Sequence, residues 1–176
     1  MVDGGAGSLV IAPDGDERRM FAEARSSDTA RRDAEDAFRF KPAATRDGRR
    51  IEILVNVAGQ DELDHIDVRS CDGIGLMRSE FLFRDGEPLP DEEQQYRAYR
   101  RFLAWAEGRP VTIRTLDIGG DKPVAGLTPS GESNPFLGLR GVRLTLARTD
   151  VFRTQLRALA RAAVHGALKV MIPMVT

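Results

Sequence analysis

The chain has 176 residues, of which 41% are hydrophobic and 30% are charged, and its formal net charge is −1. This size predicts one globular domain with a substantial core, and the near-neutral charge argues against a nucleic acid or an anionic membrane as partner. Cys71 is the only cysteine, which excludes an intrachain disulfide and a cysteine-based metal cluster. No apolar run approaches the ~20 residues that cross a bilayer, and the first residues lack the pattern of a secretory signal. We therefore expect a cytoplasmic protein without membrane insertion.

The first part of the chain is predicted to be a linker. A short apolar run, SLVIAP at residues 8–13, indicates an isolated strand. Residues 14–41 are polar with sparse apolar positions, which predicts a helix with a thin apolar stripe. Residues 41–50 contain proline and glycine and predict a turn at a domain boundary, which we place after residue 48.

Apolar runs and helical patterns alternate over the rest of the chain. Strands are predicted at 51–57, 73–83, 111–118 and 167–175, and helices at 61–72, 89–108 and 150–167. Asp91 and Asp150 are the predicted N-caps of the second and third helices. The alternation predicts a parallel α/β sheet or barrel whose strands are buried on both faces. Since the last residues form a strand without a following helix, we expect the chain to be part of a larger architecture.

Four arginines, Arg78, Arg84, Arg114 and Arg140, stand at or just after these apolar runs. Burying a guanidinium group is costly unless it meets an anion, and its fork of donors suits phosphate and carboxylate oxygens. Ligands of parallel α/β folds bind at the carboxyl ends of the strands. We therefore predict that these arginines converge on a phosphate- or carboxylate-bearing ligand.

The loop DIGGDK, residues 117–122, groups Asp117, Asp121 and Lys122 around two glycines. The alternative interpretation is an ordinary glycine turn with a solvated charge pair. Glu80 belongs to an apolar run that is expected to fill a core, and its carboxylate is a candidate partner for Arg78. His65 and His165 fall in predicted helices without further metal ligands at suitable spacing, so we expect neither to be catalytic.

Together these segments resemble the phosphoenolpyruvate-binding domain of Enzyme I, the phosphoenolpyruvate–protein phosphotransferase family of the bacterial sugar phosphotransferase system. The resemblance covers residues 51–176 and rests on GIGLMRSEFLF, LPDEEQQYRAY, VTIRTLDIGGDKP, NPFLGLRGVRL and KVMIPMV.

The resemblance implies that residues 49–176 are the first half, about four parallel strands, of a (βα)8 TIM barrel, an α/β fold. Residues 1–48 would then be the end of a phosphohistidine domain and a linker helix. The family transfers phosphate from phosphoenolpyruvate to its own histidine and then to a phosphocarrier protein, and it forms homodimers through the barrel domain. The implied activity is that of a transferase.

The resemblance also implies a substrate site. Arg78 and Arg114 match the arginines that bind the phosphate and carboxylate of phosphoenolpyruvate, and Arg140 is an expected third contact. Asp117 and Lys122 are expected to line the same site. The family's phosphorylated histidine, its Mg²⁺ ligands and its proton-donating cysteine have no counterparts here, so we expect the chain alone to be catalytically incomplete.

Two alternatives remain open. The chain could be a non-catalytic module that binds phosphoenolpyruvate or pairs with an Enzyme I subunit to regulate it. It could also derive from a pyruvate phosphate dikinase-like enzyme, although TLDIGGDK is the Enzyme I form of its loop. The sequence does not distinguish the sugar branch from the nitrogen-regulatory branch.

Overall fold

The computed structural model describes residues 1–176 except residues 6, 120–123, 125, 129–136 and 176. It divides into two compact units, Met1–Lys41 and Pro42–Thr176. The boundary predicted after residue 48 falls within the turn between β3 (Ala43–Ala44) and β4 (Arg50–Ile51). No described helix has the length and apolar character that a membrane span requires.

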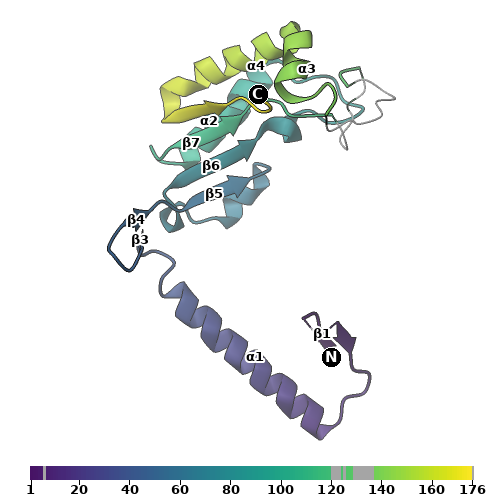
Figure 1. Cartoon of the computed structure of the whole chain (residues 1–176), viewed down its shortest axis with the longest axis vertical. Coiled ribbons are helices and arrows are strands. Elements are labelled where there is room, and N and C mark those ends of the chain that lie inside the picture. The colour runs from purple at the N-terminus through teal and green to yellow at the C-terminus, as the bar shows by residue number, and fades with distance from the viewer. Residues whose placement is uncertain (6, 120–123, 125, 129–136, 176) are drawn as a thin grey trace. The chain divides into compact units, whose positions relative to one another are not determined.

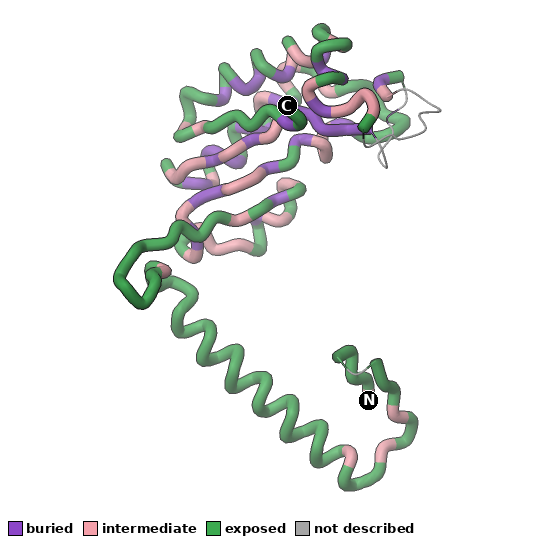
Figure 2. The backbone as a smooth tube through the Cα atoms, in the orientation of Figure 1, coloured by how far each residue is buried: buried purple, intermediate pink, exposed green. Residues whose placement is uncertain are grey.

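The first unit consists of a small antiparallel pair and one long helix. Strand β1 (Val2–Asp3) pairs with β2 (Ser8–Leu9), and α1 (Gly15–Asp36) follows. A capping box starts α1, because the Asp14 carboxylate accepts from the Glu17 amide while the Glu17 side chain accepts from the Asp14 amide. None of its residues is buried, as Figure 2 shows. The predicted polar helix is thus confirmed, and packing within this unit contributes little to its stability.

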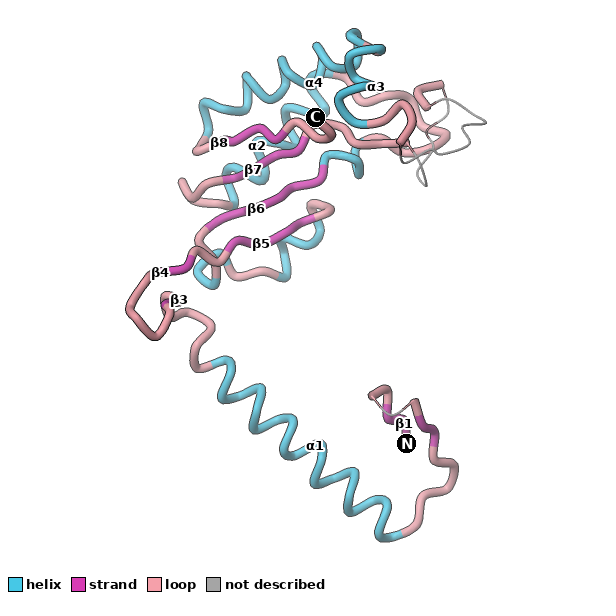
Figure 3. Tube along the Cα trace, viewed as in Figure 1, coloured by secondary structure: helices cyan, strands magenta, loops and turns pink. Residues whose placement is uncertain are grey.

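The second unit is built on a four-stranded parallel sheet, seen in magenta in Figure 3. The strands neighbour one another in chain order, β5-β6-β7-β8, and both main helices pack against one another and against the sheet (Figure 1). This mixed α/β architecture is that of a partial (βα)8 barrel preceded by a helix, as predicted. The elements are β5 (Leu54–Val57), β6 (Gly73–Arg78), α2 (Glu92–Trp105), β7 (Val111–Arg114), α3 (Gly141–Ala147), α4 (Thr149–Ala162) and β8 (Leu168–Met171).

The core lies between the sheet and the helices α2 and α4. Side chains from one face of the strands, such as Ile74 and Ile113, pack with Phe102 and Leu103 of α2 and Leu159 of α4. Each such side chain, once buried, contributes about 2 kcal/mol of hydrophobic stabilisation. A second apolar cluster lies beyond the carboxyl ends of the strands and joins the chain after β7 to α3 and α4. Its members are Phe83, Leu116, Ile118, Val124, Leu127, Leu144 and Val151.

Local hydrogen bonds explain two predictions that were wrong. Residues 61–72 form two short 3₁₀ helices (Asp61–His65 and Val68–Ser70) instead of one α-helix, because the Asp67 carboxylate accepts from the Arg69 amide and favours a turn. The strand predicted at 51–57 is interrupted after Ile51, because the Ile53 amide donates to the Asp72 side-chain carboxylate and not to a neighbouring strand.

Other predicted elements also differ from the structure. The strand predicted at 73–83 ends at Arg78, and a 3₁₀ helix follows (Ser79–Leu82). Helix α3 was not predicted, because it has only seven residues and begins with a glycine. Asp150 is not the cap of α4: it lies in the first turn, where its carboxylate pairs with Arg148. The Asp91 cap is confirmed as a capping box with Gln94.

Candidate functional site

Strands β6 and β7 end side by side and place two arginines next to each other. Arg78 and Arg114, the last residues of these strands, are register partners. Parallel neighbours lie about 4.8 Å apart, and paired residues project from the same face of the sheet. Because Ile113 faces the helices, Arg114 and Arg78 belong to the opposite face. The predicted meeting of two strand-end arginines is therefore present in the structure.

Arg114 is held by two carboxylates. Its Nη2 donates to Glu80 Oε1 at 2.9 Å, and its Nη1 lies 3.2 Å from Asp117 Oδ2. Glu80 Oε1 also accepts from the Asp117 backbone amide at 3.0 Å. All three side chains are largely buried, with exposed fractions of 22% for Arg114, 13% for Glu80 and 6% for Asp117. Ionic bonds at this level of burial fix the orientation of the guanidinium group.

Arg140 joins the same cluster through Asp117. Its Nε donates to Asp117 Oδ1 at 3.1 Å, so the two oxygens of one carboxylate contact two arginines. The approach requires a glycine at position 119, where φ is +115°. A Cβ there would lie 3.0 Å from Arg140 Cβ and 3.2 Å from the Leu139 carbonyl oxygen. The loop after β7 therefore packs closely against the residue that precedes α3.

Arg78 lies beside this ionic cluster without joining it. Arg114 and Arg140 both pair with Asp117, and Arg114 also pairs with Glu80. The Arg78 side chain is exposed and makes no hydrogen bond or ion pair within the part of the chain that is described. Arg114 Nε and Glu80 Oε2 are buried without a hydrogen-bond partner. An anion at the strand ends would provide an acceptor for the exposed Arg78 guanidinium group.

A buried hydrogen-bond network lies beneath these strand ends. Gln155 of α4 accepts from the Leu116 amide and donates to Ser79 and Tyr99, and Tyr99 donates to Gln95. Burial raises the pKa of the Tyr99 hydroxyl well above its ordinary value, which keeps it protonated as a donor. Sequence reasoning missed this network, because a single glutamine in a helix otherwise indicates a solvated position.

The carboxylate of Glu80, a candidate partner for Arg78, pairs with Arg114 instead. Lys122 and Asp121 lie outside the described residues.

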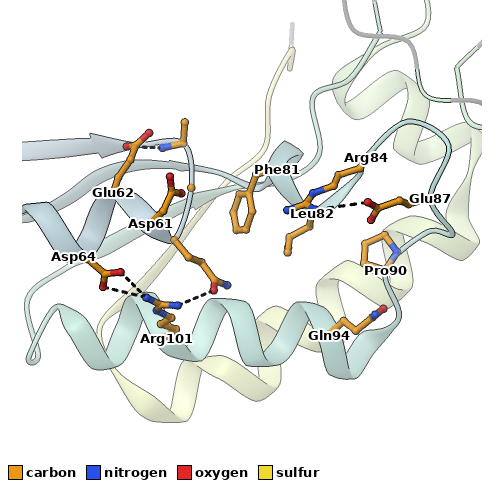
Figure 4. Close-up of a pocket in the computed structure, with 13 residues that line it drawn as sticks. Asp61, Glu62, Asp64, Phe81, Leu82, Arg84, Glu87, Pro90, Gln94 and Arg101 are labelled. Carbon is orange, nitrogen blue, oxygen red and sulfur yellow. Dashed lines mark hydrogen bonds and ion pairs between the residues drawn. The ribbon is translucent and has the colours of Figure 1, made fainter.

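Arg84 does not join the cluster, contrary to prediction. It lies 3.6 Å from Glu87 at the rim of a separate cleft of about 760 Å³, shown in Figure 4. The cleft runs between the chain after β5 and the chain after β6, over α2, with Phe81 and Arg101 among its lining residues. Arg78, Arg114 and Arg140 do not line this cleft, so we assign the candidate site to the strand ends.

Neither histidine is close to a metal-binding arrangement. His165 Nε2 lies 2.9 Å from the Tyr96 hydroxyl, and the described residues contain no group of three potential metal ligands. Cys71 is buried, and its thiol contacts the Val68 carbonyl oxygen. The side chains of His165 and Cys71 therefore contribute to local structure.

Comparison with known proteins shows which family the chain belongs to. The sequence profile of the family described as PEP-utilising enzyme, PEP-binding domain, matches residues 32–176. This chain belongs to that family. The matched range contains both strand-end arginines, the two carboxylates that hold Arg114, and Arg140.

Curated relatives match nearly the whole chain. The multiphosphoryl transfer protein of Rhodobacter capsulatus is 42% identical over 99% of the chain, and the phosphoenolpyruvate-protein phosphotransferase of Enterococcus faecalis is also 42% identical over 99%. The enzyme of that name from Staphylococcus aureus is 41% identical over the same share. The chain spans 21% of the length of the first relative and 31% of the other two.

Proposed function

We propose that this chain forms the phosphoenolpyruvate-binding part of a phosphoenolpyruvate–protein phosphotransferase. The observation that carries the proposal is the register pairing of exposed Arg78 with Arg114, whose guanidinium group is held by Glu80 and Asp117. The names of the relatives support the substrate and the reaction class.

Phosphoenolpyruvate carries two anionic groups, a phosphate ester and a carboxylate, on the same carbon atom. Exposed Arg78 is suited to contact one group, and the N–H donors of Arg114 that Glu80 and Asp117 do not occupy are suited to contact the other. Glu80 and Asp117 keep Arg114 in place without occupying all of its donors. Phosphoryl transfer depends mainly on such positioning and on neutralising the charge of the transferred group.

The described residues do not fit a Mg²⁺ site. The two carboxylates at the strand ends, Glu80 and Asp117, are both engaged with arginines, and no group of three potential ligands occurs in the described ranges. We therefore assign no role to Mg²⁺ at these strand ends. The Mg²⁺ ligands, the phosphorylated histidine, the phosphocarrier partner and the homodimer that the resemblance implies stay predictions. Lys122 stays a predicted contact.

Titration calorimetry tests the proposal. The chain should bind phosphoenolpyruvate more tightly than inorganic phosphate or pyruvate, because each of these carries only one of the two anionic groups. Arg78→Ala should weaken phosphoenolpyruvate binding at least about tenfold. Unchanged affinity in that variant would refute the assignment.

A further inference from the structure

The buried hydrogen-bond network beneath the strand ends has a defined direction. A backbone carbonyl lies at one end, where Gln95 Nε2 donates to Pro90 O at 3.0 Å. A backbone amide lies at the other, where Leu116 N donates to Gln155 Oε1 at 2.9 Å. A carbonyl can only accept and an amide N–H can only donate, so these two groups fix the orientation of both glutamine side chains.

The remaining bonds follow from these two ends. With its oxygen facing Leu116, Gln155 turns its NH₂ group to the Tyr99 hydroxyl at 3.0 Å and the Ser79 hydroxyl at 3.1 Å. Tyr99 in turn donates to Gln95 Oε1 at 3.0 Å. Ser79, Gln95, Tyr99 and Gln155 all have exposed fractions of 0%. A buried network whose members are satisfied in only one orientation is rigid.

Gln155 is the member that contacts both strand ends. Ser79 follows Arg78 directly at the end of β6, and Leu116 lies between Arg114 and Asp117 after β7. One side chain on α4 therefore bonds to the chain beside each strand-end arginine. If these bonds are lost, Arg78 can shift relative to Arg114, although neither arginine contacts Gln155 itself.

We propose that Gln155 is a positioning residue that sets the separation between Arg78 and Arg114 and so selects a ligand with two adjacent anionic groups. The inference rests on the proposed function. The affinity of a ligand that bridges both arginines depends on their separation, whereas the affinity of a ligand that contacts only one of them does not. Gln155 thus acts on the preference for phosphoenolpyruvate over inorganic phosphate.

The test compares three variants by titration calorimetry with phosphoenolpyruvate and with inorganic phosphate. Gln155→Met removes both contacts at nearly constant volume, and Ser79→Ala removes only the bond to the end of β6. Tyr99→Phe is the matched control, since it deletes a buried hydroxyl of the same network but leaves the bonds to Ser79 and Leu116 intact. Thermal unfolding of each variant measures the accompanying loss of stability.

We expect Gln155→Met and Ser79→Ala to weaken phosphoenolpyruvate binding about tenfold and to change phosphate binding less than about twofold. Tyr99→Phe should lose stability but keep the wild-type ratio of the two affinities. The inference is overturned if Ser79→Ala and Gln155→Met keep that ratio, or if Tyr99→Phe lowers it equally. If Gln155→Met does not fold, the result for Ser79→Ala decides. A wild-type chain that binds neither ligand would instead refute the proposed function, and this inference with it.

Discussion

Arg78 and Arg114 are predicted to differ in what they contribute to stability, although both belong to the same site. Arg114→Ala would leave Glu80 and Asp117 largely buried without their shared cation. Removing one partner of a fully buried pair costs about 3 to 5 kcal/mol. Arg114 is 22% exposed, so we expect a smaller loss of unfolding free energy, about 2 kcal/mol, which corresponds to a fall in Tm of about 6 to 10 °C. Arg78→Ala removes an exposed side chain without a described partner and should change the unfolding free energy by less than about 0.5 kcal/mol.

The assay is urea denaturation followed by the fluorescence of Trp105. This is the only tryptophan, and it packs against the core of the second unit, so its signal reports on the fold that carries the site. Arg114→Lys is a useful comparison, because it keeps a positive charge between the carboxylates but loses the forked geometry. Equal stability of the two alanine variants would show that Glu80 and Asp117 reach solvent once Arg114 is removed, and the ionic cluster would not stabilise the fold.

Three further predictions concern the fold around the site. Hydrogen bonds from the Ile53 backbone amide and from Arg50 lower the pKa of the Asp72 carboxyl. A carboxylate with a lowered folded-state pKa stabilises the fold above its unfolded pKa and loses this effect as the pH falls. Asp72→Asn should therefore lower the denaturation midpoint at neutral pH, and the difference from wild type should shrink below about pH 4. Gly73→Ala should lower the unfolding free energy by about 2 to 3 kcal/mol, because its Cβ would lie 2.3 Å from the Pro110 carbonyl oxygen. Gly86→Ala, at a position with positive φ but open space, should lower it by about 1 kcal/mol. Equal losses of unfolding free energy in the two variants would exclude the clash. Leu103→Ala should cost about 3 kcal/mol through a core cavity, and Leu156→Ala, at a position 38% exposed, well under half of that; a similar Tm for both would place Leu103 outside the core.

The strands and the main helices were predictable because their apolar periodicity is strong. Helix α2 combines a capping box at Asp91 with apolar positions on one side, and both signals are local. The helix predicted at residues 61–72 was wrong because the Asp67 turn competes with a helix whose apolar side is weak. Short α3 has too few residues for periodicity to identify it.

The site was predictable to the extent that it depends on strand ends. Arg78 and Arg114 follow apolar strands, and parallel pairing brings such positions together. The pairing of Glu80 with Arg114 depends on the turn that the chain takes after β6, which redirects the glutamate toward the next strand. Gln155 could not be found, because its burial is decided by segments far apart in the sequence.

The central claim is that Arg78 and Arg114 bind one ligand together. Nitrogen-15 NMR of the arginine Nε–H groups tests this directly, with Arg78→Lys and Arg114→Lys used to assign the two signals. The Arg114 Nε is buried, so its proton should exchange slowly enough to be observed, while that of exposed Arg78 should become protected only on binding. We predict that both signals shift with added phosphoenolpyruvate and saturate at the same concentration. A shift in only one of them, or two different saturation points, would contradict a shared site.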